Sequence, residues 1–185
     1  MVAQIKTAQM KTNPTDLNSP KSASIVTPIK GNVQVFIAPH RNLYADIIAQ
    51  GLRVAGQGTQ VLLVQLFQTG INQGLKNPRR LVENLEWFRC EAQRDLSQDD
   101  IELTDVEKLA VLELWDYAKV AIKSARASLV ILDEANLLVL RSLITEDELI
   151  EVLETRSPKV NIILTGASMP SRIAEYAEQV THRRS

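Results

Sequence analysis

Short apolar runs alternate along this chain with longer segments in which apolar residues recur at helical spacing. A continuous apolar run of strand length predicts a strand that is buried on both faces. Such runs predict strands at Val33–Ala38, Gln60–Leu66, Ser128–Leu132 and Val160–Leu164. Weaker patterns predict further strands at Glu86–Cys90 and Val180–His182, and a loop at 67–78.

Helices are predicted between these strands. Thr104 with Glu107, and Thr145 with Glu148, have the spacing of a capping box, which marks a helix start. The helix after Thr104 is expected to turn an apolar face to the core, formed by Leu109, Leu112, Trp115, Val120 and Ile122. Other helices are expected at 43–55 (closed by Gly56 and Gly58), at 79–86, from 145 to about 155, and at 170–179 after an N-cap at Ser168.

Strands that alternate with helices of this length predict a three-layer α/β fold, with a mostly parallel sheet and helices on both faces. Ligands of such folds bind at the carboxyl ends of the strands. The loops after Ala38, Leu132 and Leu164 are therefore the places where a functional site is expected.

The first thirty residues differ in composition from the rest. They are rich in Thr, Ser, Lys, Gln and Pro, and they carry four lysines against one aspartate. Too little apolar surface is available there to offset the entropy of ordering, which predicts a flexible tail at 1–30 and a single domain at 31–185. An organelle transit peptide and an arm that binds a partner protein remain alternatives.

Charge and cysteine content narrow the class of protein. The net charge of −1 supplies no field that favours nucleic acid or an anionic membrane, so neither partner is expected. The lone Cys90 excludes an intrachain disulfide and a cysteine-built zinc site. The apolar runs are too short to span a membrane. We therefore expect a soluble cytoplasmic protein.

Polar residues follow the predicted strands at two places. Asp133 and Glu134 come directly after a buried strand, where an acidic pair either holds a magnesium ion or simply ends the strand. Asn136 either joins such a site or forms a turn. His40, in the loop after the first strand, is either a general base or an exposed loop residue.

Three segments together resemble one family. Residues 31–65, the motif LVILDEANLLV at 129–139 and the segment IILTGASMPSRIAEYAEQVT at 162–181 are similar to the P-loop-type corrinoid adenosyltransferases. Trp115 matches a tryptophan that is typical of that family. The resemblance implies a fold of the P-loop NTPase (RecA-like) type, a homodimer, and transfer of adenosine from ATP, with magnesium, to a reduced corrinoid.

The loop after the first strand departs from that family. Where its members carry Gly-Asn-Gly-Lys-Gly-Lys-Thr-Thr, this chain has Ala-Pro-His-Arg-Asn-Leu-Tyr-Ala at 38–45. Leu43 replaces the lysine that reaches the terminal phosphates, and Tyr44 replaces the threonine that binds magnesium. Pro39 has no N–H group to donate to a phosphate.

These losses predict a degenerate phosphate-binding loop. A vestigial nucleotide or anion site is expected at His40, Arg41, Asn42 and Asn136, and a magnesium site at Asp133 and Glu134. The leading hypothesis is a catalytically impaired relative that acts as a binding or regulatory module, with the tail as a route to a protein partner. The alternative is an active ATP:corrinoid adenosyltransferase with a non-standard ATP site.

Overall fold

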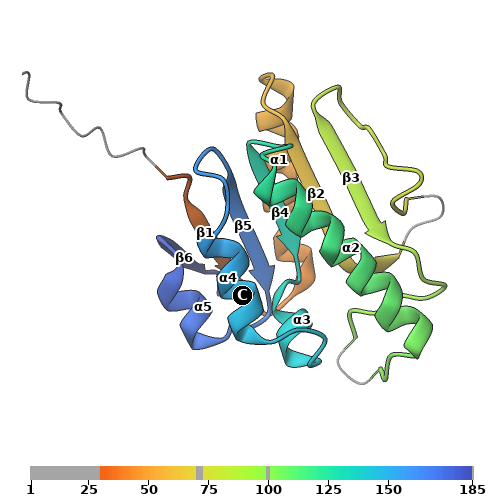
Figure 1. Ribbon diagram of the computed structural model, residues 1–185. Coiled ribbons are helices and arrows are strands. Elements are labelled where there is room, and N and C mark those ends of the chain that lie inside the picture. The colour runs from red at the N-terminus through yellow and green to blue at the C-terminus, as the bar shows by residue number, and fades with distance from the viewer. Residues whose placement is uncertain (1–29, 70–72, 99–100, 185) are drawn as a thin grey trace, which may run out of the picture.

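The computed structural model describes residues 30–69, 73–98 and 101–184, with the side chain of Asn42 excepted (Figure 1). Except for Lys30, the predicted tail lies outside these residues. Six parallel strands form one sheet in the order β3-β2-β4-β5-β1-β6. Their bounds are β1 Val33–Ile37, β2 Val61–Thr69, β3 Leu85–Cys90, β4 Leu129–Asp133, β5 Asn161–Gly166 and β6 Gln179–His182.

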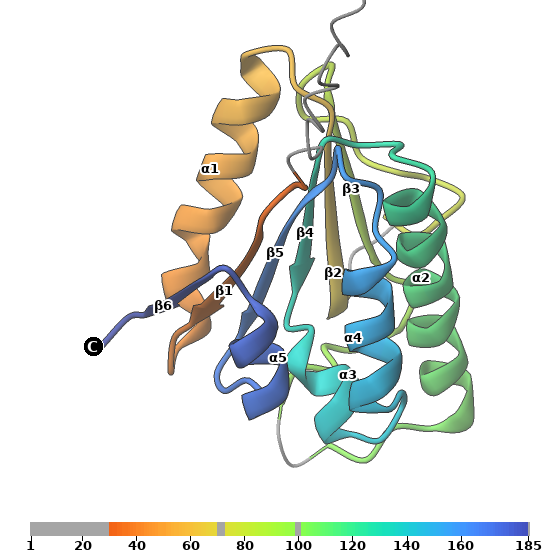
Figure 2. The ribbon, with the colours of Figure 1, turned by 60° about the vertical axis from the view of Figure 1, so that its left-hand side comes forward.

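Helices cover both faces of the sheet, which confirms the predicted α/β class. A 3-10 turn, η1, leads directly into α1 on one face, and the other helices lie on the opposite face (Figure 2). The bounds are η1 Arg41–Tyr44, α1 Ala45–Gly56, α2 Asp105–Lys123, α3 Asn136–Leu140, α4 Glu146–Glu154 and α5 Ser171–Tyr176. The turn after α1 is made by Gly58, whose φ of +92° is readily adopted only by glycine.

Each face of the sheet has its own apolar core. Under α1, Phe36 and Tyr44 pack with the residues of β2, β3 and β4 whose side chains face this helix. On the other face, Trp115 of α2 is fully buried, and its Nε1 donates a hydrogen bond of 2.9 Å to the Glu148 carboxylate of α4. This bond joins the two helices that cover the centre of the sheet.

The two predicted capping boxes have different outcomes. At α2 the Thr104 side chain accepts from the Glu107 N–H, and the Glu107 carboxylate accepts from the Thr104 N–H. At α4 the Thr145 hydroxyl caps the helix in the same way. The Glu148 carboxylate, however, accepts from Trp115 and from a lysine instead of closing the box.

Several predicted elements were wrong. The first three residues of the loop predicted at 67–78 belong to β2, which continues to Thr69 and buries Phe67. The short helix predicted at 79–86 is absent: Arg79 instead forms an isolated antiparallel bridge with Trp87. That bridge satisfies the backbone groups of both residues, so a helix is not needed there.

The predicted apolar face of α2 was partly wrong. Trp115 and Ile122 are buried, but Leu109 and Val120 are 58% and 66% exposed. Small residues, Ala118 and Ala121, take their place against the sheet, because a close approach of helix and sheet favours small side chains. Helix α5 also begins later than predicted, after Pro170, and no side chain caps it.

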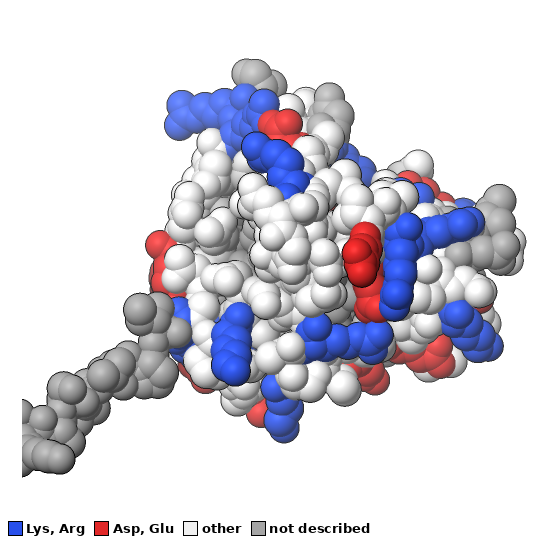
Figure 3. Space-filling model, turned by 90° about the horizontal axis from the view of Figure 1, so that it is seen from above, with Lys and Arg blue, Asp and Glu red and all other residues white. Residues whose placement is uncertain are grey.

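The amino ends of the strands form the upper end of the molecule in Figure 1. Seen from above, this end presents mainly uncharged surface, with side chains of both charge signs around its margin (Figure 3). The carboxyl ends of the strands lie at the opposite end, where the polar residues of the candidate site meet.

Candidate functional site

Three strands place polar side chains side by side at the carboxyl edge of the sheet. Gln65 of β2 lies opposite Asp133 of β4 in the parallel register, and Thr165 of β5 lies on the other side of Asp133. All three continue the row of residues that faces α1. Because strand residues alternate between faces, this row points toward the start of α1.

Asp133 has hydrogen-bond donors on both of its carboxylate oxygens. Oδ1 accepts from the Thr165 hydroxyl at 2.7 Å, and Oδ2 accepts from the Gln65 amide at 2.8 Å. Oδ2 also accepts from Nη2 of Arg41 at 2.6 Å. The residue is 2% exposed, so its negative charge depends on these partners for stabilisation.

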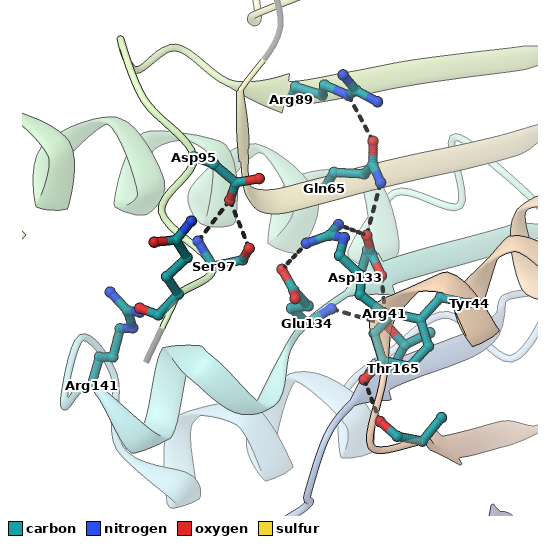
Figure 4. Close-up of polar contacts among 12 residues, drawn as sticks. Arg41, Tyr44, Gln65, Arg89, Asp95, Ser97, Asp133, Glu134, Arg141 and Thr165 are labelled. Atoms are coloured by element: carbon teal, nitrogen blue, oxygen red, sulfur yellow. Dashed lines mark hydrogen bonds and ion pairs between the residues drawn. The ribbon is translucent and has the colours of Figure 1, made fainter. Parts of the chain in front are cut away.

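Arg41 also contacts the second acid of the pair. Its Nη1 lies 2.5 Å from Oε2 of Glu134, so one guanidinium bridges both carboxylates (Figure 4). The Glu134 backbone N–H donates to the Thr165 hydroxyl at 2.9 Å. Glu134 has a φ of +58°, a conformation that costs about 1–3 kcal/mol in a residue other than glycine.

The network continues away from the acids toward the edge of the sheet. Gln65 Oε1 accepts from Trp87 Nε1 at 2.8 Å and from Arg89 Nε at 2.7 Å. The Arg89 guanidinium lies 4.8 Å from the centre of the Trp87 ring, at cation–π distance. A cavity of about 260 Å³ opens here, lined by Arg41, Tyr44, Ala45, Ile48, Gln65, Gln68, Trp87, Arg89 and Asp133.

Sequence analysis missed this part of the site. The available signal was a polar residue at the end of an apolar run, as with Gln65 after VLLV and Thr165 after IIL. Trp87 and Arg89, two residues apart on one strand, offered no such signal. Their role depends on strand order, which places β3 beside β2.

The loop before α1 uses its polar groups internally. The Ala38 N–H donates to the Gly166 carbonyl at 3.2 Å, and the Leu43 N–H donates to the His40 carbonyl at 3.1 Å. The Tyr44 hydroxyl, buried under α1, donates to the Ala38 carbonyl at 3.0 Å. The N–H groups of Ala38 and Leu43 are thus engaged within the protein, and Pro39 has none to donate to a phosphate.

The residues present do not fit the magnesium that the family resemblance implies. Both oxygens of Asp133 already accept hydrogen bonds, and a cation, Arg41, lies against Asp133 and Glu134. Tyr44 directs its hydroxyl to a backbone carbonyl rather than to this space. Among the described residues, no group of three or more His, Cys, Asp and Glu side chains is arranged to hold a metal ion.

The other predicted site residues are distributed around this pair. Arg41, Asp133 and Glu134 meet directly, as the loop positions predicted, but Arg41 is bonded to acids. His40 is exposed at the tip of the loop. The Asn42 side chain lies outside the described part of the structure.

Asn136 lies on the other side of Glu134, in a second cavity. This cavity has a volume of about 310 Å³ and is lined by Ser97, Glu134, Asn136, Leu137, Leu140, Ala167 and Ser168. Asn136 is buried against Gly166, where any side chain would overlap with its amide. Its Oδ1 accepts no hydrogen bond from any described residue.

The wall of this second cavity is held by its own hydrogen bonds. Ser97 donates from its hydroxyl to Asp95 at 2.6 Å, and Arg141 donates to the Gln98 carbonyl at 2.5 Å. These contacts fix the segment before α2 near Glu134 (Figure 4). The two acids of the pair therefore have different surroundings. Asp133 is enclosed by its hydrogen bonds to Arg41, Gln65 and Thr165, whereas Glu134 borders the second cavity.

The acidic pair makes the stability of the protein depend on pH. Burial, with a further contribution from the charge of Asp133, raises the pKa of Glu134 from 4.5 to about 7, although Arg41 opposes this shift. Between these values the folded protein binds a proton that the unfolded chain does not. The free energy of unfolding should therefore fall as the pH rises from about 4.5 to about 7, by up to about 1.4 kcal/mol per pH unit.

Urea unfolding between pH 5 and pH 8 measures this slope. The Glu134→Gln variant should lose the decrease, whereas substitution of an exposed acid, Glu175→Gln, should leave it in place. A slope that is the same in wild type and in Glu134→Gln would contradict the assignment.

No helix among the described residues is long and apolar enough to cross a membrane. Comparison with known proteins identifies a family and a curated relative. A family model described as ATP:corrinoid adenosyltransferase BtuR/CobO/CobP matches residues 45–185, starting directly after the loop at 38–44.

Among curated proteins, the uncharacterized protein all2391 of Nostoc sp. (strain PCC 7120) is 32% identical over 77 residues. That match covers 42% of this chain and 20% of the relative, so the chain spans about a fifth of the relative's length. The family match, in contrast, extends over most of the chain, including the acidic pair, Asn136 and the strands that carry them. The chain therefore belongs to the ATP:corrinoid adenosyltransferase family.

Proposed function

We propose that this protein is a catalytically impaired member of its family that serves as a binding or regulatory module. The observation that carries the proposal is the position of Arg41. Its guanidinium lies on both Asp133 and Glu134, the acids that border the magnesium site in P-loop proteins. The Arg41 guanidinium thus occupies the position at which the transfer reaction would need an exchangeable magnesium ion.

Charge balance supports this interpretation. Two carboxylates without a partner attract a divalent cation strongly, but Arg41 neutralises one charge, and protonation of Glu134 near pH 7 reduces the other. Leu43 and Tyr44 supply neither the cation nor the ligand that hold a triphosphate and its metal. Each lost charge-assisted hydrogen bond weakens binding by about 1.5–3 kcal/mol.

Calorimetry with MgATP tests the proposal. Loss of two or three such bonds corresponds to an affinity on the order of a thousandfold weaker than that of an intact phosphate-binding loop. We expect little heat at micromolar protein and the same result when magnesium is removed with EDTA. Micromolar binding that survives Leu43→Ala and is lost in Asp133→Asn would overturn the proposal.

An active transferase with a non-standard ATP site is the second candidate. The cavity of about 310 Å³ beside Glu134, with the unpaired Oδ1 of Asn136 in its wall, favours it. A buried amide without a partner is costly and is often explained by a ligand. Adenosylation of reduced cobalamin, followed by its absorption spectrum, decides between the two: turnover that depends on ATP and is lost in Asn136→Ala supports the transferase.

The assembly and location implied by the resemblance belong to the same proposal. We propose a homodimer in the cytoplasm, and a sedimentation measurement of the mass in solution tests the dimer.

A further inference from the structure

A groove between α2 and α4 lies away from the acidic pair. It has a volume of about 470 Å³ and is lined by Lys119, Val120, Ile122, Lys123, Glu148, Glu151, Val152, Thr155 and Arg156. Val120 projects into this region with 66% of its surface exposed. The carboxyl-terminal halves of both helices form it, so it opens toward the amino ends of the strands.

The described chain begins at the rim of this groove. The Lys30 ammonium donates to the Glu154 carbonyl at the end of α4, at 2.8 Å. The Gly31 N–H donates to the Pro158 carbonyl at 2.8 Å, and its own carbonyl accepts from Arg156. Because Arg156 also lines the groove, the described chain begins directly beside it.

The segment before Lys30 matches the groove in apolar character. Ile25, Val26 and Ile29 form a short apolar stretch in an otherwise polar tail. Five extended residues reach about 16 Å. The nine residues of α4 span about 13 Å. The stretch at 25–29 is therefore long enough to follow α4 across the groove.

Both signs of charge line the groove. Of the five acids of α4, Glu148 and Glu151 line it, together with the cations Lys119, Lys123 and Arg156. The tail carries four lysines and one aspartate within residues 1–30. On the opposite wall, Lys119 is already paired with Asp116 and Glu148, which reduces its repulsion of the tail.

We infer that residues 25–29 dock in the groove between α2 and α4, with their apolar side chains on Val120 and Val152 and the tail lysines near the acids of α4. The protein thus carries its own occupant for this surface. The inference concerns the face away from Arg41 and Asp133, so it stands or fails independently of the proposed function.

Disulfide trapping in the full chain tests the docking. Val26→Cys with Val120→Cys forms the groove pair, and Val26→Cys with Arg53→Cys, on exposed α1, forms the control pair. Burial raises the pKa of the Cys90 thiol to about 12 and keeps it out of the reaction. Under mild oxidation at low protein concentration, we expect an intramolecular disulfide in the groove pair and little in the control pair.

Hydrogen exchange supplies a second measurement that needs no cysteine. In a full-length Ile25→Asp/Val26→Asp variant, the amides of 119–123 and 148–155 should exchange at least several-fold faster than in wild type. Thr12→Asp, farther along the tail, should leave them unchanged. Equal trapping in both cysteine pairs, disulfides only between molecules, or unchanged exchange in the double variant would each overturn the inference.

Discussion

The Asp133→Ala variant is expected to lose about 3–5 kcal/mol of the free energy of unfolding, because it removes the acceptor at the centre of a buried network. Asp133 is 2% exposed and accepts from Arg41, Gln65 and Thr165. Without it, two neutral donors lose their partner, and a guanidinium whose side chain is only 27% exposed keeps Glu134 alone.

Urea unfolding at pH 7 measures this loss, and two further variants define its origin. The exposed pair of Asp147 with Arg172 supplies a matched control, and Asp147→Ala should change the unfolding free energy by less than about 1 kcal/mol. The double variant Arg41→Met/Asp133→Ala should recover part of the loss, because it removes the half-buried cation that has lost one of its two carboxylate partners. An Asp133→Ala protein as stable as wild type would show that the network contributes nothing to folding.

Tyr44→Thr, which restores the residue type of the family loop, is expected to cost about 3–5 kcal/mol of stability. The Tyr44 ring is 3% exposed and meets Phe36 edge to face, with ring centres 6.2 Å apart. Replacement by threonine leaves a cavity under α1 and removes the hydroxyl bond to the Ala38 carbonyl. The variant should gain no measurable affinity for MgATP, because the lysine and the glycines remain absent.

Tyr44→Phe separates packing from hydrogen bonding. It keeps the ring and loses only the hydroxyl, so the expected cost is about 1 kcal/mol. Thermal or urea unfolding compares the two variants, and calorimetry follows MgATP. Equal destabilisation by Tyr44→Thr and Tyr44→Phe would assign the effect to the hydrogen bond, and MgATP binding by Tyr44→Thr would contradict the account of the loop.

The predictions for Asp133 and Tyr44 both depend on the loop at 38–44. Ala38 and Tyr44 belong to the core under α1, and Arg41 bonds the acids at the sheet edge. Glycine at these positions would supply neither the packing nor the charge. This loop therefore contributes to the stability of the fold as well as to the site.

Much of the fold follows from local patterns. Continuous apolar runs predicted the central strands, and the Thr104–Glu107 spacing predicted the start of α2, because both depend on residues close together in the chain. The short helix predicted at 79–86 was wrong because a strand contact, and not the local pattern, decides this segment. Arg79 is held by an isolated bridge to Trp87, which lies across a turn.

The sequence by itself determined the α/β class, the family resemblance and the absence of glycine and lysine from residues 38–45, since each is a property of neighbouring positions. Only the tertiary structure decided what Arg41 does. The anion site at Arg41 stays a prediction, and the structure shows that the Arg41 guanidinium bonds carboxylates 92 and 93 residues away. Gln65, Trp87 and Arg89 join them only because strand order places β3, β2 and β4 side by side. Such contacts depend on how the sheet is assembled, and no local spacing encodes them.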